Sequence, residues 1–498
     1  MKYLNAALLA DFYKLSHRLM YPTGTTTVYS TWTPRASRVT GVDQVVNFGT
    51  QAFLIRLQSI FEDNFFSCPK EEVLAEYARI VKHTLGVANP DTKHLEELHD
   101  LGYLPLSIRA LPEGAVVPLR VPTMTVENTD PRFFWLTNYV ETLASCELWQ
   151  ASTSATIARE YRKILDKYAM ETVGNTDFVQ FQGHDFSMRG MSSLESAVLS
   201  GMGHLTQFAG TDTVPAIQGA EHFYGANVEK ELVGTSIPAT EHSIQCAYGD
   251  DMAYLNRMIT EVHPVGMVSV VSDGYDFWDV IGRVLPALKD KILARDGKLV
   301  IRPDSGDPVK IICGDDDAPY GSLEQKGAVE ALWEIFGGTY SNKTNNRSSD
   351  NYKLLNSHIG LIYGDAITLR RAEEICERLK KKGFASTNVV FGIGSYTYQY
   401  NTRDTFGYAM KSTLCVVNNE ERQIFKNPKT DDGTKKSQKG RVAVFKGSDT
   451  YVFVDGFKLN DEIPGNQLKE VFRDGKLVGK SHTFEEIRAR LRNQNGKV

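Results

Sequence analysis

Residues 299–306 read Leu-Val-Ile-Arg-Pro-Asp-Ser-Gly, a short apolar run that passes directly into a charged turn containing Pro and Gly. A run of this length and composition is typical of a strand buried in a parallel sheet. The same pattern, with an amphipathic helical stretch after each turn, recurs between about Val179 and Gly394. The recurrence indicates a sheet whose strands all end in polar residues.

Seven such strands are expected between these limits. They are residues 179–181 before His184, Asp185 and Phe186; 208–209 before Gly210, Thr211 and Asp212; 236–239 before Glu241 and His242; 267–271 before Ser272 and Asp273; 299–301 before Arg302 and Asp304; 359–362 before Gly364 and Asp365; and 389–391 before Gly392, Gly394 and Ser395. Helical patterns fill the gaps, such as residues 192–208 with a Ser192/Glu195 capping box, and residues 367–382. This alternation predicts a parallel sheet.

Two parallel architectures place functional groups at the carboxyl ends of strands. A doubly wound sheet uses mainly its switch point, whereas a closed α/β barrel can use every strand. Seven polar strand ends favour the barrel. The predicted fold class is therefore α/β, an irregular seven-stranded TIM-like barrel beside a mostly β (α+β) second domain built from both chain ends.

The second domain is predicted from strands on either side of the barrel. Its expected strands are residues 28–32, 45–48, 106–110, 115–119 and 123–127 before the barrel and 413–417 and 441–445 after it, with helices near 71–85 and 135–151. The predicted domains are residues 1–150 plus 405–498 as the α+β domain, and 151–404 as the barrel that carries the active site.

Composition excludes several classes of protein. The 498 residues are 42% hydrophobic and 23% charged, with a net charge of -5, so neither disorder nor a nucleic-acid-binding surface is expected. There is no apolar run of bilayer length and no secretory signal in the first ten residues. Six cysteines without CxxC spacing suit reduced thiols. We expect a cytoplasmic protein without nucleic-acid or membrane partners.

Two polar tracts are expected at the surface. Residues 341–351 lie in a longer stretch, 307–353, to which the sequence assigns no role. The Lys-rich tract 426–441 is expected to be a solvated loop, and its functional alternative is a lid that closes over phosphates.

The residues at the strand ends suggest one kind of chemistry. Carboxylates, arginines and a glycine loop together suit a phosphorylated sugar bound with Mg²⁺. Each residue alone has a simpler interpretation, because an Asp at a strand end is often a helix cap and Phe186 or Tyr13 could be core aromatics. His242 could be a satisfied core histidine, although its neighbour Glu241 could orient a reactive imidazole. The cleft set comprises Asp185, Asp212, Asp273, Asp304, Asp365, Arg189, Arg302 and Arg403.

Seven strings along the chain resemble the type II phosphoribosyltransferase family, and within it the nicotinamide phosphoribosyltransferases. The resemblance is collinear from about Asp11 to about Arg490 and is greatest with bacterial or phage-like members. The strings are Asp11-Phe12-Tyr13-Lys14 and residues 127–131, 184–190, 210–213, 238–243, 269–276 and 301–306.

The resemblance implies a reaction and an assembly. The reaction joins nicotinamide to phosphoribosyl pyrophosphate, giving nicotinamide mononucleotide and pyrophosphate in NAD salvage. The assembly is a head-to-tail homodimer whose active sites lie at the interface. Phe186 and Tyr13 of the partner subunit would stack on the pyridine ring. Asp212 would accept a hydrogen bond from the carboxamide NH₂ and, when ionised, would repel the carboxylate of nicotinate.

The resemblance also assigns the remaining substrate contacts. Arg302 would lie near the carboxamide and ribose, and Asp304 and Asp365 near the ribose or a metal shell. Gly394 and Ser395 would form the loop for the 5′-phosphate. The other implied substrate-binding residues are Ser269, Gly364, Arg189, Arg403 and Lys411, the last from either subunit.

The catalytic roles come from the same resemblance. His242 would be phosphorylated by ATP, a co-substrate, with Glu241 and Asp273 orienting it. Mg²⁺ would be held by Asp273 and Asp304, directly or through water. Breaking the bond to pyrophosphate builds positive charge on the ribose, so the leaving group must be stabilised and no covalent nucleophile is needed.

The chain departs from the family pattern at two places, and other functions stay open. It has Gly394-Ser395 where many members have Gly-Gly, and Gly364-Asp365-Ala366 where they have Gly-Asp-Gly. The nearest alternative is a nicotinate phosphoribosyltransferase. A phosphosugar-binding barrel lyase would want a strand-end Lys or a His cluster, and the seven strand ends offer neither. A non-catalytic protein that keeps the scaffold is the third alternative.

Overall fold

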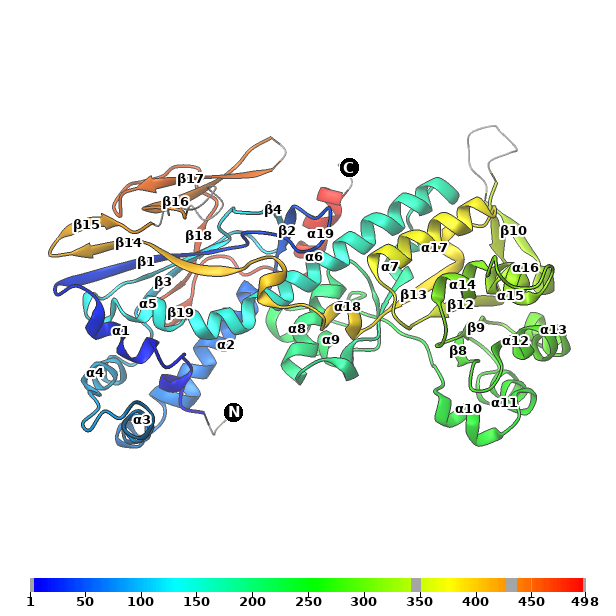
Figure 1. Cartoon of the computed structure of the whole chain (residues 1–498), viewed down its shortest axis with the longest axis horizontal. Helices are drawn as coiled ribbons and strands as arrows, with labels where there is room; N and C mark the ends of the chain where they lie inside the picture. The colour runs from blue at the N-terminus through cyan, green and yellow to red at the C-terminus, as the bar shows by residue number, and fades with distance from the viewer. Residues whose placement is uncertain (1–3, 342–350, 426–436, 449, 496–498) are drawn as a thin grey trace. The chain divides into compact units, whose positions relative to one another are not determined.

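The protein divides into two compact units (Figure 1). Unit 1 comprises Met1–Thr156, Glu221–Ala226 and Asn401–Val498, and unit 2 comprises Ile157–Ala220 and Asn227–Tyr400. The structure, a computed structural model, describes residues 4–341, 351–425, 437–448 and 450–495. Each unit encloses its own core of buried apolar side chains.

Unit 2 contains a curled parallel sheet, a half-barrel. Within its described residues six strands pair in the order β7-β6-β13-β12-β9-β8. The strands from apolar runs are almost wholly buried, as parallel strands covered on both faces must be. They confirm the predictions at 267–271, 299–301, 359–362 and 389–391. The bounds are β6 Gly183–Asp185, β7 Gly210–Thr211, β8 Val268–Val271, β9 Leu299–Arg302, β12 Ile359–Tyr363 and β13 Val389–Ile393.

Two strands lie slightly later in the chain than predicted, because each of them begins at a glycine that follows the apolar run. Residues 179–181 were expected as a strand, but they lie in helix α7 (Val179–Gln182), and β6 begins at Gly183. A Cβ at Gly183 would lie 2.8 Å from the Phe208 ring. Residues 208–209 likewise precede β7, where a Cβ on Gly210 would lie 2.8 Å from Nδ1 of His184. These close approaches require glycine, which normally indicates a turn.

The seventh predicted strand, residues 236–239, is not a strand in the structure. This segment makes isolated parallel bridges instead, from Thr235 to Gly210 of β7 and from Ala239 to Ser269 of β8. Pro238 lacks an amide hydrogen, so this segment cannot make a full ladder of hydrogen bonds. The prediction of seven regular strands is therefore wrong for this segment.

Helices fill the gaps between these strands. In α17, Thr368 caps the first turn, and Ala372, Ile375, Cys376 and Leu379 form one buried stripe. The predicted Ser192/Glu195 capping box is wrong: Ser193, one residue later, caps α8 by accepting from the Ser196 amide at 3.0 Å. The bounds are α8 Leu194–Leu205, α9 Val214–Tyr224, α10 His242–Tyr248, α11 Asp251–Arg257, α12 Phe277–Asp279, α13 Leu285–Ala294, α14 Pro308–Cys313, α15 Leu323–Lys326, α16 Ala328–Phe336, α17 Leu369–Lys381 and α18 Ser395–Tyr398, with the hairpin β10 Gly338–Tyr340 and β11 Lys353–Leu355.

Unit 1 is built on an antiparallel sheet that draws on both ends of the chain. Its described strands pair in the order β15-β14-β1-β5-β3-β18-β19, and β1 lies beside β14 although they are far apart in sequence (Figure 1). The predicted return of the chain end to this unit is confirmed. The strands are β1 Thr25–Thr33, β2 Gln44–Asn47, β3 Leu106–Ala110, β4 Ala115–Pro118, β5 Met124–Asn128, β14 Ala409–Val417, β15 Glu420–Gln423, β16 Arg441–Lys446, β17 Tyr451–Phe457, β18 Lys469–Arg473 and β19 Lys476–Leu477.

Helices of unit 1 cover this sheet and the smaller pair formed by β2 and β4. The helix predicted near 135–151 is two helices, α5 and α6, and α6 contains the boundary between the units. The bounds are α1 Lys14–Met20, α2 Thr50–Phe61, α3 Lys70–Leu85, α4 Lys93–Leu101, α5 Leu136–Tyr139, α6 Glu141–Thr172 and α19 Phe484–Asn495.

Four further expectations concern two polar tracts, the cysteines and membrane-spanning helices. The tract 341–351 and the possible lid 426–441 lie largely outside them, at 342–350 and 426–436. All six cysteines are described and none forms a disulfide. Across the described ranges, no helix has both the length and the apolar character needed to cross a membrane.

A buried acid of unit 1 predicts how stability depends on pH. Glu113 accepts hydrogen bonds from the Gly49 and Gln51 amides, yet its burial raises the pKa to about 7 from an ordinary value of 4.5. The folded state therefore holds this proton more tightly, and that stabilisation is complete below pH 4.5 and is lost as the pH rises through 7. Between pH 5 and pH 8 the loss is on the order of 3 kcal/mol.

The Glu113→Gln variant should lack this component of the pH dependence. Urea unfolding of the wild type and the variant at pH 5 and pH 8 measures it. Relative to the wild type, the variant should gain about 3 kcal/mol between these two pH values. Glu72→Gln, on the exposed face of α3, is the control. Parallel pH profiles for wild type and Glu113→Gln would contradict the argument.

Candidate active site

The polar residues that follow the parallel strands of unit 2 meet at one edge of its sheet. Strands β7, β6, β13, β12, β9 and β8 run in the same direction, so their carboxyl ends share that edge. Two groups of side chains in contact form there. We call them the amide cluster (His184, Asp212 and Ser236) and the carboxylate cluster (His242, Asp273, Asp304 and Ser305).

Phe186, directly after β6, lies over two glycines. A Cβ at Gly392 would lie 2.3 Å from Cδ2 of the ring, and one at Gly364 would lie 2.9 Å from it. The Phe186 amide donates to the Ile393 carbonyl at 3.0 Å, which fixes the backbone beside β13. The ring is partly exposed. It could therefore stack on a flat ligand, provided that positions 364 and 392 remain glycine.

The amide cluster is centred on the Asp212 carboxylate, which follows β7. Nε2 of His184 lies 2.9 Å from Oδ1 of Asp212, and the Ser236 hydroxyl donates to the same oxygen at 2.6 Å. Burial alone would raise the pKa of Asp212, but these two hydrogen bonds outweigh it and hold the pKa below its ordinary value. Asp212 is therefore an ionised acceptor at neutral pH.

His184 and Ser236 were assigned no role from the sequence. His184 belongs to the string 184–190, and Ser236 begins an apolar run. The available signal was that His184 follows one expected strand and Ser236 begins another. It is weak, because a sequence does not show which side chains meet across neighbouring strands.

The carboxylate cluster joins the ends of β8 and β9. Nε2 of His242 lies 3.1 Å from Oδ1 of Asp273, whose Oδ2 accepts from the Asp304 amide at 3.0 Å and the Ser305 hydroxyl at 2.6 Å. The Asp273 side chain is 4% exposed and that of His242 is 47% exposed. Asp273 thus holds an accessible imidazole. The Glu241 carboxylate accepts from the Ser243 hydroxyl, and within the described chain it makes no hydrogen bond to His242.

Arg302, at the end of β9, and Ser269, within β8, are both buried. Arg302 donates to the Thr240 carbonyl at 3.0 Å. Burial acts to raise the pKa of both Asp212 and Asp304, and the charge of Arg302 opposes that rise at each. Arg302 thus links the two clusters electrostatically. Within the described residues, Nε of Arg302 and the hydroxyl of Ser269 have no hydrogen-bond partner. Both are buried polar groups whose hydrogen-bonding capacity the protein leaves unused.

Asp304 and Asp365 complete the acidic part of the site. Burial raises the pKa of Asp304, and the nearby carboxylates of Asp273 and Asp365 raise it further. Ala366 adopts φ +50°, a left-handed conformation that glycine accommodates more easily. A glycine at position 366 would adopt this conformation without strain.

The residues present fit a divalent cation only in part. No group of three His, Cys, Asp or Glu side chains in the described chain could hold a metal ion by itself. Both oxygens of Asp273 already accept hydrogen bonds, whereas Asp304 is half-buried with a raised pKa. An incoming cation would relieve the repulsion at Asp304. Such a site suits Mg²⁺ that keeps waters and shares ligands with a phosphate.

The predicted phosphate loop follows β13. Gly394 caps the single turn α18 with φ -92° and ψ -174°, so it needs no left-handed conformation. A Cβ at Gly190 would lie 2.1 Å from Oγ of Ser395, so the chain beside Arg189 lies directly against this loop. Arg189 itself is exposed. The backbone that follows Arg189 thus packs against this loop.

Three predicted site residues belong to unit 1. Tyr13 is 57% exposed, with its ring edge-on to His17 at 4.9 Å. Tyr13 and Arg403 line one hollow of about 550 Å³ together with Asp11, Glu141 and other residues. Lys411 is exposed on β14, opposite Thr31. Unit 1 thus brings two of the three predicted residues together.

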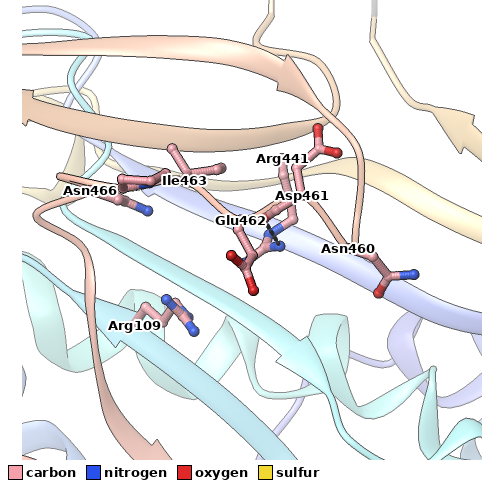
Figure 2. Close-up of a pocket in the computed structure, with 8 residues that line it drawn as sticks. Arg109, Arg441, Asn460, Asp461, Glu462, Ile463 and Asn466 are labelled. Atoms are coloured by element: carbon pink, nitrogen blue, oxygen red, sulfur yellow. Dashed lines mark hydrogen bonds between the residues drawn. The ribbon is translucent and has the colours of Figure 1, made fainter.

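A second hollow of unit 1 does not contain predicted site residues. It has a volume of about 400 Å³ and lies between β3 and the loop before β18, with Arg109, Arg441 and Glu462 facing it (Figure 2). Asp461 also lines it, and both guanidiniums act electrostatically on the partly buried Glu127. Acidic and basic side chains are balanced here, so this hollow offers a phosphate no excess positive charge.

A family model and two relatives match this chain in sequence. The model of the nicotinate phosphoribosyltransferase (NAPRTase) family matches residues 181–476. The chain is 49% identical to a nicotinamide phosphoribosyltransferase of Acinetobacter baylyi over 99% of this chain and 98% of the relative. It is 37% identical to a protein of the same name from Mycoplasma pneumoniae, over 88% of this chain and 95% of the relative.

Solved structures show the fold alone. The human nicotinic acid phosphoribosyltransferase is similar with a TM-score of 0.56 and 17% identity, over 98% of this chain and 93% of that chain. A nicotinate-nucleotide pyrophosphorylase of Pyrococcus furiosus has a TM-score of 0.58 and 16% identity, over 99% and 95%. Together with the matched sequence, these findings place the chain in the nicotinate phosphoribosyltransferase family.

Proposed function

We propose that this protein is a nicotinamide phosphoribosyltransferase, which transfers phosphoribosyl from phosphoribosyl pyrophosphate to nicotinamide in NAD salvage. The products are nicotinamide mononucleotide and pyrophosphate. The observation that carries the proposal is the ionised Asp212, held by two donors close to the partly exposed Phe186. The relatives of the same name in Acinetobacter baylyi and Mycoplasma pneumoniae support it.

The ionised Asp212 selects an amide over an acid. A carboxamide NH₂ can donate to it, whereas the carboxylate of nicotinate would meet a like charge. Phe186 supplies one stacking face for the pyridine ring. The unpaired Nε of Arg302 and hydroxyl of Ser269 offer donors to the carboxamide oxygen or the ribose.

Two acidic side chains of the site would stabilise the positive charge that develops on the ribose. Loss of pyrophosphate leaves positive charge at C1 and on the ring oxygen, and Asp304 and Asp365 would stabilise it. We propose that Asp304 also contacts Mg²⁺ directly and Asp273 through water. Mg²⁺ would neutralise charge on the leaving pyrophosphate. Arg189, Gly394 and Ser395 would hold the 5′-phosphate.

His242 is proposed as the group that couples ATP hydrolysis to the reaction. Because Nε2 lies against Asp273, the opposite nitrogen, Nδ1, would take the γ-phosphoryl group from ATP and release ADP. Hydrolysis of the phosphohistidine returns phosphate and the free imidazole. The Glu241 side chain would have to move before it could orient His242, because its carboxylate accepts a hydrogen bond from the Ser243 hydroxyl.

The direct test uses purified protein with nicotinamide, phosphoribosyl pyrophosphate and Mg²⁺. Nicotinamide mononucleotide and pyrophosphate should form in equal amounts, and ATP should raise the yield. The absence of both products would overturn the proposal. Faster turnover of nicotinate at equal concentration would favour the nicotinate enzyme instead. Cleavage of a phosphosugar without nicotinamide would favour a lyase.

We also propose a cytoplasmic homodimer with closed barrels and shared active sites. The bridges at Thr235 and Ala239 suit closure of the six-stranded sheet by the segment between them. Tyr13, Arg403 and Lys411 belong to unit 1. The partner subunit would supply Tyr13 to the site on unit 2, and Lys411 would come from either subunit. Six unpaired cysteines suit a reducing compartment.

Co-expression of two inactive variants tests the shared site. If Tyr13→Ala and Asp304→Asn subunits pair at random, half of the dimers are mixed and one of their two sites is intact, so about a quarter of the activity should return. Co-expression of Asp304→Asn with Asp273→Ala is the control, because both residues belong to unit 2 and no intact site can form. No recovery in the first pair would contradict the shared site.

A further inference from the structure

The two donors of the amide cluster contact the same oxygen of Asp212. The His184 contact at 2.9 Å and the Ser236 contact at 2.6 Å both end on Oδ1. In the described part of the chain, no hydrogen bond reaches Oδ2. One carboxylate oxygen is therefore saturated by the protein, and the other is available to a ligand.

His184 is itself held in a defined position. It lies on β6, with Gly210 of β7 beside its Nδ1 edge and its ring 4.9 Å from that of Phe186. Its side chain is 11% exposed, so it has little freedom to turn away. To donate to a carboxylate, Nε2 must carry the hydrogen. The imidazole therefore acts as a fixed donor aimed at Oδ1.

Ser236 is fixed by its backbone and not by burial. Its neighbour Thr235 exchanges backbone hydrogen bonds with the strand that precedes Asp212, donating to Ala209 at 2.7 Å and accepting from Thr211 at 2.9 Å. The Ser236 side chain remains exposed. The segment between β7 and β8 thus delivers a second donor to Oδ1 from the side opposite β6.

We propose that His184 and Ser236 are positioning residues that determine the selection of amide over acid. By occupying Oδ1 they keep Asp212 ionised and present Oδ2 alone to the carboxamide NH₂. Selectivity then belongs to three side chains and not to Asp212 by itself. This inference rests on the proposed function, because it assumes that the ring bound on Phe186 carries a carboxamide.

Paired substitutions separate the hydrogen bond from packing. His184→Phe keeps a ring beside Phe186 but removes the donor, whereas His184→Gln keeps a donor but removes the ring. His184→Phe should raise the KM for nicotinamide about tenfold, while the KM for phosphoribosyl pyrophosphate changes less than about twofold. The preference for nicotinamide over nicotinate should fall by about the same factor. His184→Gln should restore most of that loss.

A substitution at Ser236 gives a second test with little effect on folding. Because its side chain is exposed, Ser236→Ala should fold normally and raise the KM for nicotinamide about threefold, with recovery in Ser236→Thr. His83→Ala, on the exposed face of α3, is the matched control. Thermal unfolding midpoints identify any variant whose fold is damaged, and in that case Ser236→Ala alone decides.

The outcomes are distinct from those that test the proposed function. If the wild type makes no mononucleotide, the proposed function fails before any variant is compared. Suppose instead that the wild type is active, that His184→Phe leaves the KM for nicotinamide unchanged and that His184→Gln raises it. In that case the His184 ring acts by packing and does not position Asp212. That result, or an unchanged KM in Ser236→Ala, would overturn the inference.

Discussion

The Asp304→Asn variant is expected to lose about 100- to 1000-fold in kcat at saturating substrates. Asparagine has the same shape as aspartate but no charge, so the decrease in kcat would measure the contribution of the negative charge at position 304. The backbone amide of residue 304 would still donate to Asp273, because the substitution leaves the main chain unchanged. Burial raises the pKa of Asp304 and Arg302 opposes that rise, so ionisation of this carboxyl depends on its surroundings.

A steady-state measurement with both substrates saturating distinguishes charge from binding. The matched control is Asp307→Asn in the same loop. Asp307 caps α14 by accepting from the Val309 amide at 2.8 Å, and asparagine caps a helix equally well. Asp307→Asn should therefore keep wild-type kcat. An Asp304→Asn enzyme that retained more than about a tenth of the wild-type kcat would show that its charge does not support the ribose.

Apolar runs allowed four strands of unit 2 to be predicted, and glycine concealed the others. Strands β8, β9, β12 and β13 consist mainly of Val, Ile and Leu, so their burial is evident from composition. Strands β6 and β7 begin at Gly183 and Gly210, where the chains approach too closely for a side chain. A glycine at such a place normally indicates a turn. Composition therefore predicts strands made of buried apolar side chains. It misses strands that need glycine because a neighbouring segment approaches the backbone too closely.

The site shows the same division between local and long-range information. Strand ends indicated Phe186, Asp212 and Asp273, because parallel strands bring their carboxyl ends together. His184 and Ser236 stand 28 and 24 residues from Asp212 along the chain. Only the pairing of the chain segments brings them to one oxygen. A hydrogen bond across strands has no sequence signature, and this is why the donors were missed.

The Asp212→Asn variant is expected to reverse the choice between the two pyridine substrates. His184 and Ser236 both donate, so they would bind the amide oxygen of the introduced asparagine and turn its NH₂ group toward the place of Oδ2. A donor would then face the carboxamide NH₂ of nicotinamide. The carboxylate of nicotinate would find a donor and no negative charge. The ratio of kcat/KM for nicotinamide over nicotinate should fall about 100- to 1000-fold.

Competition between the two substrates in one reaction measures that ratio directly. Asp276→Asn, which preserves the cap of α12, is the control and should keep the wild-type preference. In the double variant Asp212→Asn with His184→Phe, one of the two donors that orient the amide is gone, and part of the reversal should disappear. If Asp212→Asn lowered turnover of both substrates equally, Asp212 would contribute to binding without discriminating. A reversal that depends on His184 would instead mean that the orientation of a single side-chain amide, fixed from neighbouring strands, decides which pyridine is used.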